Sequence, residues 1–151
     1  MKPLYGETME DSFKFSMYEI QPSQLYISQT KLNNVLNAIQ SGNPLAIDPI
    51  PIKKIDGEYV STDGHTRAVA WLLSGYEYTE VMWEDENLDW EAYRICVQWC
   101  KDENITSIPD LKERIISHED YEVLWYDRCR NMQEELERIK TEGTKSHNHK
   151  N

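Results

Sequence analysis

The feature that most constrains the fold of this chain is a direct passage from a short strand into an apolar helix. Residues Glu58 to Ser61 favour a strand, and the Asp56-Gly57 turn pairs them with the segment Ile47 to Ile55 as a hairpin. The strand runs through a turn that contains Gly64 into the helix Ala68 to Leu73, in which every residue is apolar. Because such a helix has no polar face for solvent, we expect it at the centre of the domain.

The segments on either side predict further strands and an amphipathic helix. Residues Phe13 to Ile20 alternate apolar and polar side chains, which is typical of an edge strand. Ser28 or Thr30 caps a helix that ends at Gly42. Its apolar face consists of Leu32, Val35, Leu36 and Ile39. Glu80 to Trp83 predicts one more short strand after the apolar helix.

From Glu84 onward the composition changes to helix-forming residues, tryptophans and charge. Asp89 caps one helix, and Pro109 suits the first turn of a short helix that continues through Ile116. Residues 117–120 form the capping pattern of a long helix, so this half of the chain is expected to be all-helical. The apolar stripe of the long helix is Tyr121, Leu124, Trp125, Cys129, Met132, Leu136 and Ile139.

These elements predict an α/β or α+β domain with a small mixed sheet, packed helices and a C-terminal helical extension. We expect residues 1–83 to form the core and residues 84–142 to form a helical extension packed on it within one structural unit. Residues 143–151 are expected to be a polar, flexible tail. Hydrophobic residues make up 39% of the chain and charged residues 28%, which is close to the composition of globular proteins.

The charge of the chain limits its partners. Acidic residues number 27 against 16 basic ones, and Arg67 is the only arginine among the first 83 residues. Nonspecific affinity for nucleic acid comes from many lysines and arginines that neutralise phosphates, so binding to a duplex is not expected. A single arginine beside Gly64-His65-Thr66 indicates a local anion site rather than a basic face.

Two further observations predict a cytoplasmic protein with no membrane partner. No apolar run approaches the roughly 20 residues that span a bilayer, and the first residues lack the apolar stretch of a signal peptide. Three cysteines, an odd number, argue against a disulfide framework. Cys96 and Cys100 are expected to be buried thiols, because no second Cys/His pair at ligand spacing completes a zinc site.

The residues at the start of the apolar helix have the chemistry of an anion site. A strand that enters a helix through a glycine-containing turn presents unpaired N–H groups and a partial positive charge at one point. Gly64 lets a ligand approach the backbone, Thr66 offers a hydroxyl, His65 an imidazole donor and Arg67 a forked cation suited to phosphate. Asp63 can hold a metal ion or accept the proton of an attacking hydroxyl.

Each of these residues also has a purely structural interpretation. Asp63 can cap the helix, Gly64 can serve the turn, and Arg67 can pair with a surface acid. The residues taken by themselves leave both interpretations open.

Several motifs resemble the ParB/sulfiredoxin superfamily over about residues 13–83. They are Ile20-Gln21-Pro22-Ser23-Gln24-Leu25, Asp48-Pro49-Ile50-Pro51-Ile52, Asp56-Gly57-Glu58-Tyr59-Val60 and Asp63-Gly64-His65-Thr66-Arg67-Ala68. The resemblance implies a compact α/β fold that binds ATP, ADP or CTP, with the phosphates at the helix that follows the glycine-containing turn.

Within this superfamily the Asp-Gly-His-Thr-Arg form is most similar to the free serine kinases. These enzymes phosphorylate L-serine to O-phosphoserine with ADP or ATP and magnesium. Residues 89–94 and Trp99-Cys100 also resemble that group. The resemblance implies that Asp63 lies beside the transferred phosphoryl group, where it can also contact Mg²⁺. It further implies that the phosphates are bound by Gly64, His65, Thr66 and Arg67.

One departure from the kinases bears on catalysis. Their pattern implies a second catalytic acid at the start of the first helix, where this chain has Gln29. An amide cannot act as a base, so the alternative to a kinase is a non-catalytic nucleotide-sensing or interaction module. A third reading is a DNA-associated ParB-like protein, which the negative charge of the C-terminal helices disfavours. Sulfiredoxin chemistry is excluded, because the Gly64 to Arg67 segment lacks the catalytic cysteine of those enzymes.

The tryptophans allow two interpretations. Large aromatic side chains at helical spacing usually pack in a core, and we expect this for Trp83, Trp90, Trp99 and Trp125. The alternative is that they line a substrate pocket, for which Trp99 is the candidate.

Overall fold

The computed structural model describes residues 11–43 and 47–149, of which 144–149 are described as backbone only. Its main sheet is mixed, with the strand order β1-β5-β3-β4. Strand β1 (Ser12–Ser16) is antiparallel to β5 (Tyr78–Trp83), and β5 is parallel to β3 (Ile50–Ile55). Strand β3 pairs with β4 (Glu58–Ser61) as an antiparallel hairpin. The predicted mixed α+β fold is confirmed, and β1 lies at the sheet edge as predicted. The strand is shorter than the predicted Phe13 to Ile20, because Met17–Glu19 form the 3₁₀ helix η1, capped by the Ser16 hydroxyl.

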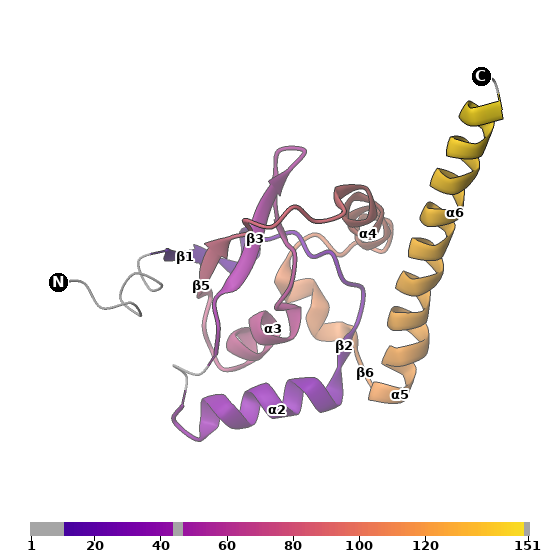
Figure 1. Ribbon diagram of the computed structural model, residues 1–151. Coiled ribbons are helices and arrows are strands. Elements are labelled where there is room, and N and C mark those ends of the chain that lie inside the picture. The colour runs from indigo at the N-terminus through magenta and orange to yellow at the C-terminus, as the bar shows by residue number, and fades with distance from the viewer. Residues whose placement is uncertain (1–10, 44–46, 150–151) are drawn as a thin grey trace.

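Two local features of the sequence build the centre of this sheet. Asp56 and Gly57 both have positive φ, at 50° and 86°, which is the backbone of a tight two-residue hairpin turn. Helix α3 (His65–Leu73) then carries the chain from β4 to β5, so that β5 lies parallel to β3 (Figure 1). The first turn of α3 is therefore placed directly at the end of β4.

Two longer helices pack around this unit. Helix α2 (Gln29–Gln40) begins after Ser28, whose hydroxyl accepts a hydrogen bond from the Lys31 N–H at 3.3 Å, as the capping prediction required. It packs against α3, as Figure 1 shows. Helix α4 (Trp90–Asp102) begins after Asp89, which accepts from the Ala92 N–H at 3.1 Å. Both predicted helix starts are confirmed.

The C-terminal part is one continuous helical run made of three segments. Helix α5 (His118–Tyr121) passes into the π-helical segment η4 (Glu122–Asp127) and then into α6 (Arg128–His149). Of the predicted stripe, Tyr121, Trp125, Cys129 and Met132 pack on the core, whereas Leu124 is 44% and Ile139 52% exposed. The far end of α6 stands clear of the other elements in Figure 1. The helix continues through residues 143–149, for which the sequence predicted a flexible tail.

The prediction that the second half is all-helical is wrong at Ile115 and Ile116. These residues form the short strand β6 (Ile115–Ile116), parallel to β2 (Ile27–Ser28). The 3₁₀ helix η3 (Ile108–Glu113) ends earlier than expected, and the Arg114 carbonyl accepts a hydrogen bond from the Ile27 N–H at 2.9 Å. Both residues are β-branched and favour a strand, so they pair with β2 instead of continuing the helix.

The apolar helix α3 is less central than its composition predicts. Ala68, Val69 and Ala70 are fully buried, but Leu73 is 46% exposed. Trp71 and Leu72 are partly buried against the core, so only the end of α3 reaches the surface. The core consists of Met17, Ile20, Leu25, Ile27, Leu32, Ile50, Ile52, Ala68, Val69, Ala70, Val81, Cys96, Cys100, Ile105, Ile108, Leu111, Tyr121 and Trp125. Within the described residues, no helix is long and apolar enough to cross a bilayer.

Candidate functional site

The turn between β4 and α3 holds its backbone in a conformation that suits glycine. Gly64 has a φ of 75° and is the N-cap of α3, and its N–H donates to Asp63 Oδ1 at 2.8 Å. A Cβ at this position would lie 2.8 Å from Nη2 of Arg67. Glycine is therefore favoured by the left-handed backbone, and any side chain here would also have to displace the Arg67 guanidinium.

The N-terminal end of α3 offers several hydrogen-bond donors. In an α-helix the first N–H groups have no acceptor within the helix, which here concerns His65, Thr66 and Arg67. No side chain caps this end, because the N-cap is a glycine. The donors and the positive end of the helix dipole thus remain available to an anion.

His65 is buried at this end of the helix with one ring nitrogen occupied. Its Nε2 accepts a hydrogen bond from the Ser23 N–H at 3.0 Å and lies 2.8 Å from the Ser61 hydroxyl. Because a backbone N–H can only donate, Nε2 carries no proton, and the neutral ring carries its proton on Nδ1. Burial lowers the pKa of His65 to about 4, against a raising effect of Asp63 and a further lowering effect of Arg67.

The Nδ1 donor of His65 has no partner among the described residues, although the side chain is only 3% exposed. A buried N–H without an acceptor costs free energy on the order of 1–3 kcal/mol. Such a donor is retained where a ligand or a bound water supplies the acceptor. His65 therefore differs from a core histidine whose two ring nitrogens are both satisfied.

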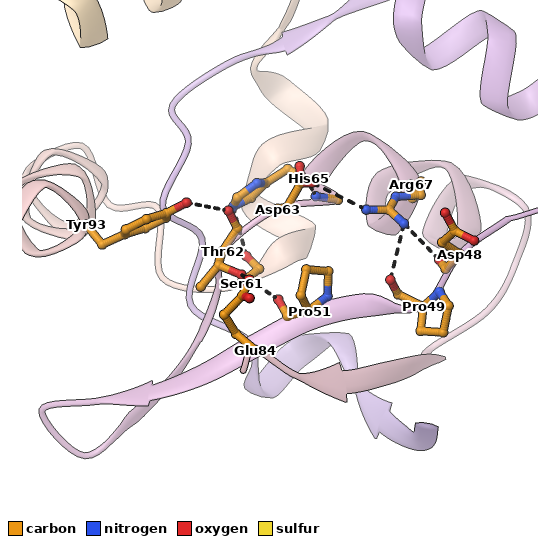
Figure 2. Close-up of polar contacts among 11 residues, drawn as sticks. Asp48, Pro49, Pro51, Ser61, Thr62, Asp63, His65, Arg67, Glu84 and Tyr93 are labelled. Atoms are coloured by element: carbon orange, nitrogen blue, oxygen red, sulfur yellow. Dashed lines mark hydrogen bonds and ion pairs between the residues drawn. The ribbon is translucent and has the colours of Figure 1, made fainter. Parts of the chain in front are cut away.

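Arg67 is held in place by the segment before β3. Its Nη1 donates to the carbonyls of Asp48 at 3.1 Å and Pro49 at 3.2 Å, while Nη2 lies 3.8 Å from Asp63 Oδ2 (Figure 2). Asp63 itself is 81% exposed. The guanidinium is thus oriented by backbone carbonyls and leaves part of its donor set open. The two carbonyl contacts could not be predicted from the sequence, whereas the pair with the exposed Asp63 agrees with the surface-acid interpretation.

A second group of polar residues surrounds Thr62, one residue before Asp63. The Thr62 hydroxyl donates to Glu84 Oε1 at 2.8 Å, and the Thr62 carbonyl accepts from the Tyr93 hydroxyl at 2.9 Å (Figure 2). Burial, followed by the negative charges of Asp63 and Glu84, raises the pKa of Tyr93 to about 12. Tyr93 thus remains a phenol at neutral pH and ties α4 to the turn.

A cavity of about 210 Å³ lies beside this turn. One wall comes from the core, and the others come from the start of α4 and from η4 with α6. No lysine or arginine lines it. The lining residues are Ser23, Gln24, Thr62, His65, Asp89, Ala92, Tyr93, Cys96, Trp125, Cys129, Met132 and Gln133. A larger hollow of about 340 Å³ around η3 contains none of the predicted site residues.

Of the predicted site residues, only His65 lines this cavity; Asp63, Gly64, Thr66 and Arg67 lie in the turn beside it, and Gln29 and Trp99 lie elsewhere. Gln29 is exposed at the first position of α2 and donates to Asn33 Oδ1 at 2.9 Å. Trp99 packs edge-on against Trp125, with ring centres 6.2 Å apart, and stacks on the guanidinium of Arg128. Trp99 therefore has the packing of a core aromatic, and Trp125 is the tryptophan at the cavity.

Sequence reasoning missed Ser23, Ser61 and Tyr93 as partners of the site. Ser61 was detectable, because it precedes His65 by four residues at the end of a strand. Ser23 and Tyr93 reach the turn through tertiary packing and have no local signal.

A magnesium ion fits this turn only together with a ligand. Among the described residues, no group of three or more histidine, cysteine, aspartate or glutamate side chains could hold a metal. Mg²⁺ is commonly bound through one or two carboxylates and substrate phosphates, with water completing the shell. The exposed carboxylate of Asp63 matches such an arrangement, in which the nucleotide brings most of the oxygen ligands.

The fold and the turn together define a small α+β protein with a candidate anion site at the start of a partly buried helix. No family model and no curated protein matches the chain. Among solved structures, protein Atu1540 from Agrobacterium tumefaciens is similar with a TM-score of 0.45 and 12% identity, over 66% of this chain and 61% of that one. A mutant free serine kinase in complex with AMP is similar with a TM-score of 0.43 and 19% identity, over 50% of this chain and 31% of that one. The chain thus spans less than two thirds of either structure, and these likenesses concern the fold alone.

Proposed function

We propose that this chain binds a nucleotide with its phosphates at the N-terminus of α3 and transfers a phosphoryl group from ADP or ATP to a small hydroxyl acceptor. L-serine is the first acceptor to test. The observation that carries the proposal is the buried Nδ1 donor of His65, which lacks a protein partner beside uncapped helix N–H groups. The resemblance of the Asp63 to Arg67 motif to the free serine kinases supports the same assignment.

The surroundings of the turn suggest one place for the phosphates of the ligand and another for its less charged part or for the acceptor. The phosphates suit the end of α3, where N–H donors, the helix dipole and Arg67 are combined. The neighbouring cavity, which no lysine or arginine lines, suits the less charged part of the ligand or the acceptor. Asp63 is exposed in the turn and can accept the proton of the acceptor hydroxyl. A magnesium ion bound with the nucleotide would neutralise phosphate charge there.

The second candidate function is a non-catalytic nucleotide-sensing module. Gln29 favours it, because the amide at the start of α2 cannot take up a proton and bonds instead to Asn33. Both candidates share the binding site and differ in turnover, so binding and product formation must be measured separately.

Isothermal titration with ADP, ATP, CTP and inorganic phosphate, each with and without magnesium, tests the binding site. We expect at least one nucleotide to bind and His65→Gln to weaken it about tenfold or more, since this change retains an acceptor near Nε2 and removes the Nδ1 donor. His118→Gln, which changes a histidine outside the turn, is the matched control. Absence of binding by all of these anions at millimolar concentration would refute the anion site.

Turnover is then measured as O-phosphoserine formed from L-serine with ADP or ATP. Product formation by the wild-type chain supports the kinase, and nucleotide binding without product for L-serine or other small hydroxyl compounds supports the sensing module. Binding that is equal in the wild type and in His65→Gln would show that nucleotides bind elsewhere on the chain.

A further inference from the structure

Two cysteines from different helices meet at the wall of the cavity. Cys96 belongs to α4 and Cys129 to the first turn of α6, and both line the cavity. The Cys96 and Cys129 thiols lie close enough that each is the largest influence on the pKa of the other. Both are free cysteines, the first buried and the second half-buried. The sequence suggested only the pair Cys96 and Cys100 on one helix, whereas packing brings Cys129 to Cys96.

The environment makes the two thiols chemically unequal. The neighbouring Cys96 thiol lowers the pKa of Cys129, and the positive charge of Arg128 lowers it further, while partial burial opposes both. The Cys129 sulfur and burial raise the pKa of Cys96. Burial also raises the pKa of Cys100, to about 12, and Cys100 is absent from the cavity lining. Cys129 is therefore the nucleophile, Cys96 the partner within reach and Cys100 the unreactive reference.

We propose that Cys129 and Cys96 form a dithiol that a peroxide oxidises reversibly to an intramolecular disulfide between α6 and α4. The Cys129 thiolate attacks one oxygen of hydrogen peroxide, the O–O bond breaks, and the leaving hydroxide becomes water with the proton that Cys129 gave up. The sulfur of Cys96 then attacks the sulfenic sulfur of Cys129. The S–O bond breaks, and the hydroxyl leaves as a second water with the Cys96 proton. Two thiols lose two electrons, and one peroxide gains them.

The helical geometry next to Cys129 permits the approach that this bond requires. A disulfide needs the sulfurs about 2.05 Å apart, closer than a hydrogen bond between thiols. The π-helical segment η4 lies directly before α6, and such segments have wider turns than an α-helix and are frequent at functional sites. Beyond Met132 the helix α6 packs little, as the exposed Ile139 shows, so its outer part does not oppose a small shift at Cys129.

The disulfide would alter the cavity wall opposite the phosphate turn. Cys96 and Cys129 line the cavity together with Tyr93, whose hydroxyl bonds to the Thr62 carbonyl one residue before Asp63. Oxidation would therefore fix the distance between the two helices that close the cavity. The chemistry itself does not depend on nucleotide binding, so it can be tested whether or not the proposed function holds.

The test uses the full chain treated with hydrogen peroxide at one to ten molar equivalents, then alkylated and mapped by mass spectrometry without reduction. We expect the number of alkylatable thiols to fall from three to one, with a Cys96–Cys129 disulfide that dithiothreitol reverses and a melting temperature several degrees higher in the oxidised form. Cys96→Ser and Cys129→Ser should abolish the crosslink, whereas Cys100→Ala should retain it. If Cys100→Ala does not fold, fragment spectra of the wild type still distinguish Cys96 from Cys100.

Three outcomes would overturn the proposal. They are three alkylatable thiols after treatment, sulfinic acid at Cys129 without a disulfide, and a crosslink between chains or through Cys100.

Discussion

The buried, neutral His65 predicts a specific loss of stability in mild acid. Folding lowers the pKa of His65 from 6.5 to about 4, chiefly through burial. At a pH between these two values, His65 therefore binds a proton in the unfolded chain and not in the folded chain. The contribution of this group to stability is complete above about pH 6.5 and is lost as the pH falls toward 4.

The size of the effect follows from the two pKa values. A shift from 6.5 to about 4 corresponds to about 3 kcal/mol once the pH is below both values. Between pH 7.5 and pH 5 the expected loss in the free energy of unfolding is about 2 kcal/mol, because only part of that interval is crossed. This is a large share of the 5–15 kcal/mol or so that stabilises a typical domain.

Urea unfolding followed by tryptophan fluorescence at pH 7.5 and pH 5 measures this loss. His65→Gln is the reference, since it cannot take up a proton and keeps an acceptor for the Ser23 N–H near Nε2. Subtraction of its pH dependence removes the contribution of the carboxylates common to both proteins. The reasoning about His65 would be refuted if the wild type and His65→Gln lost equal stability, within about 0.5 kcal/mol, between the two pH values.

Three further predictions concern the turn. Gly64→Ala should destabilise the fold by more than Gly57→Ala, for which about 1–2 kcal/mol is expected, because both have positive φ but only Gly64 would contact Arg67; equal urea midpoints would contradict this. Arg67→Ala should weaken nucleotide binding by about 1.5–3 kcal/mol in calorimetry, and it should lower stability as well, since the carbonyls of Asp48 and Pro49 lose their donor; unchanged affinity would remove Arg67 from the binding site. If the chain is a kinase, Asp63→Asn should lower turnover by roughly 10²–10⁴-fold with nucleotide affinity little changed. Gln29→Glu should raise the rate of O-phosphoserine formation. Unchanged turnover in both variants would show that neither residue takes part in catalysis.

The parts of the fold that the sequence predicted are those determined by short-range chemistry. The Asp56-Gly57 hairpin, the Ser28 and Asp89 caps and the passage through Gly64 into α3 each depend on a few adjacent residues. The pairing of β2 with β6 could not be predicted, because its two strands are distant in the chain and Ile115-Ile116 is too short to show a period.

In the candidate site, too, the sequence predicted the local motif but not the contacts that depend on tertiary packing. The motif from Asp63 to Arg67 was visible in the sequence, but the state of each side chain depends on packing. Ser23 and Ser61 occupy Nε2 of His65, which determines that Nδ1 is the available donor. The cavity was beyond sequence reasoning, since residues from α4 and α6 form two of its walls.

The outer end of α6 would move farther than the cavity wall at its base when the helix tilts. The helix has 22 residues, about 33 Å at 1.5 Å per residue, and its base carries Cys129. A tilt of about 5° at that base would move the far end by about 3 Å, as follows from this length. A change too small to see at the cavity would thus be enlarged along the helix. A spectroscopic label near the outer end of α6 would therefore report small movements of the cavity wall beside the turn.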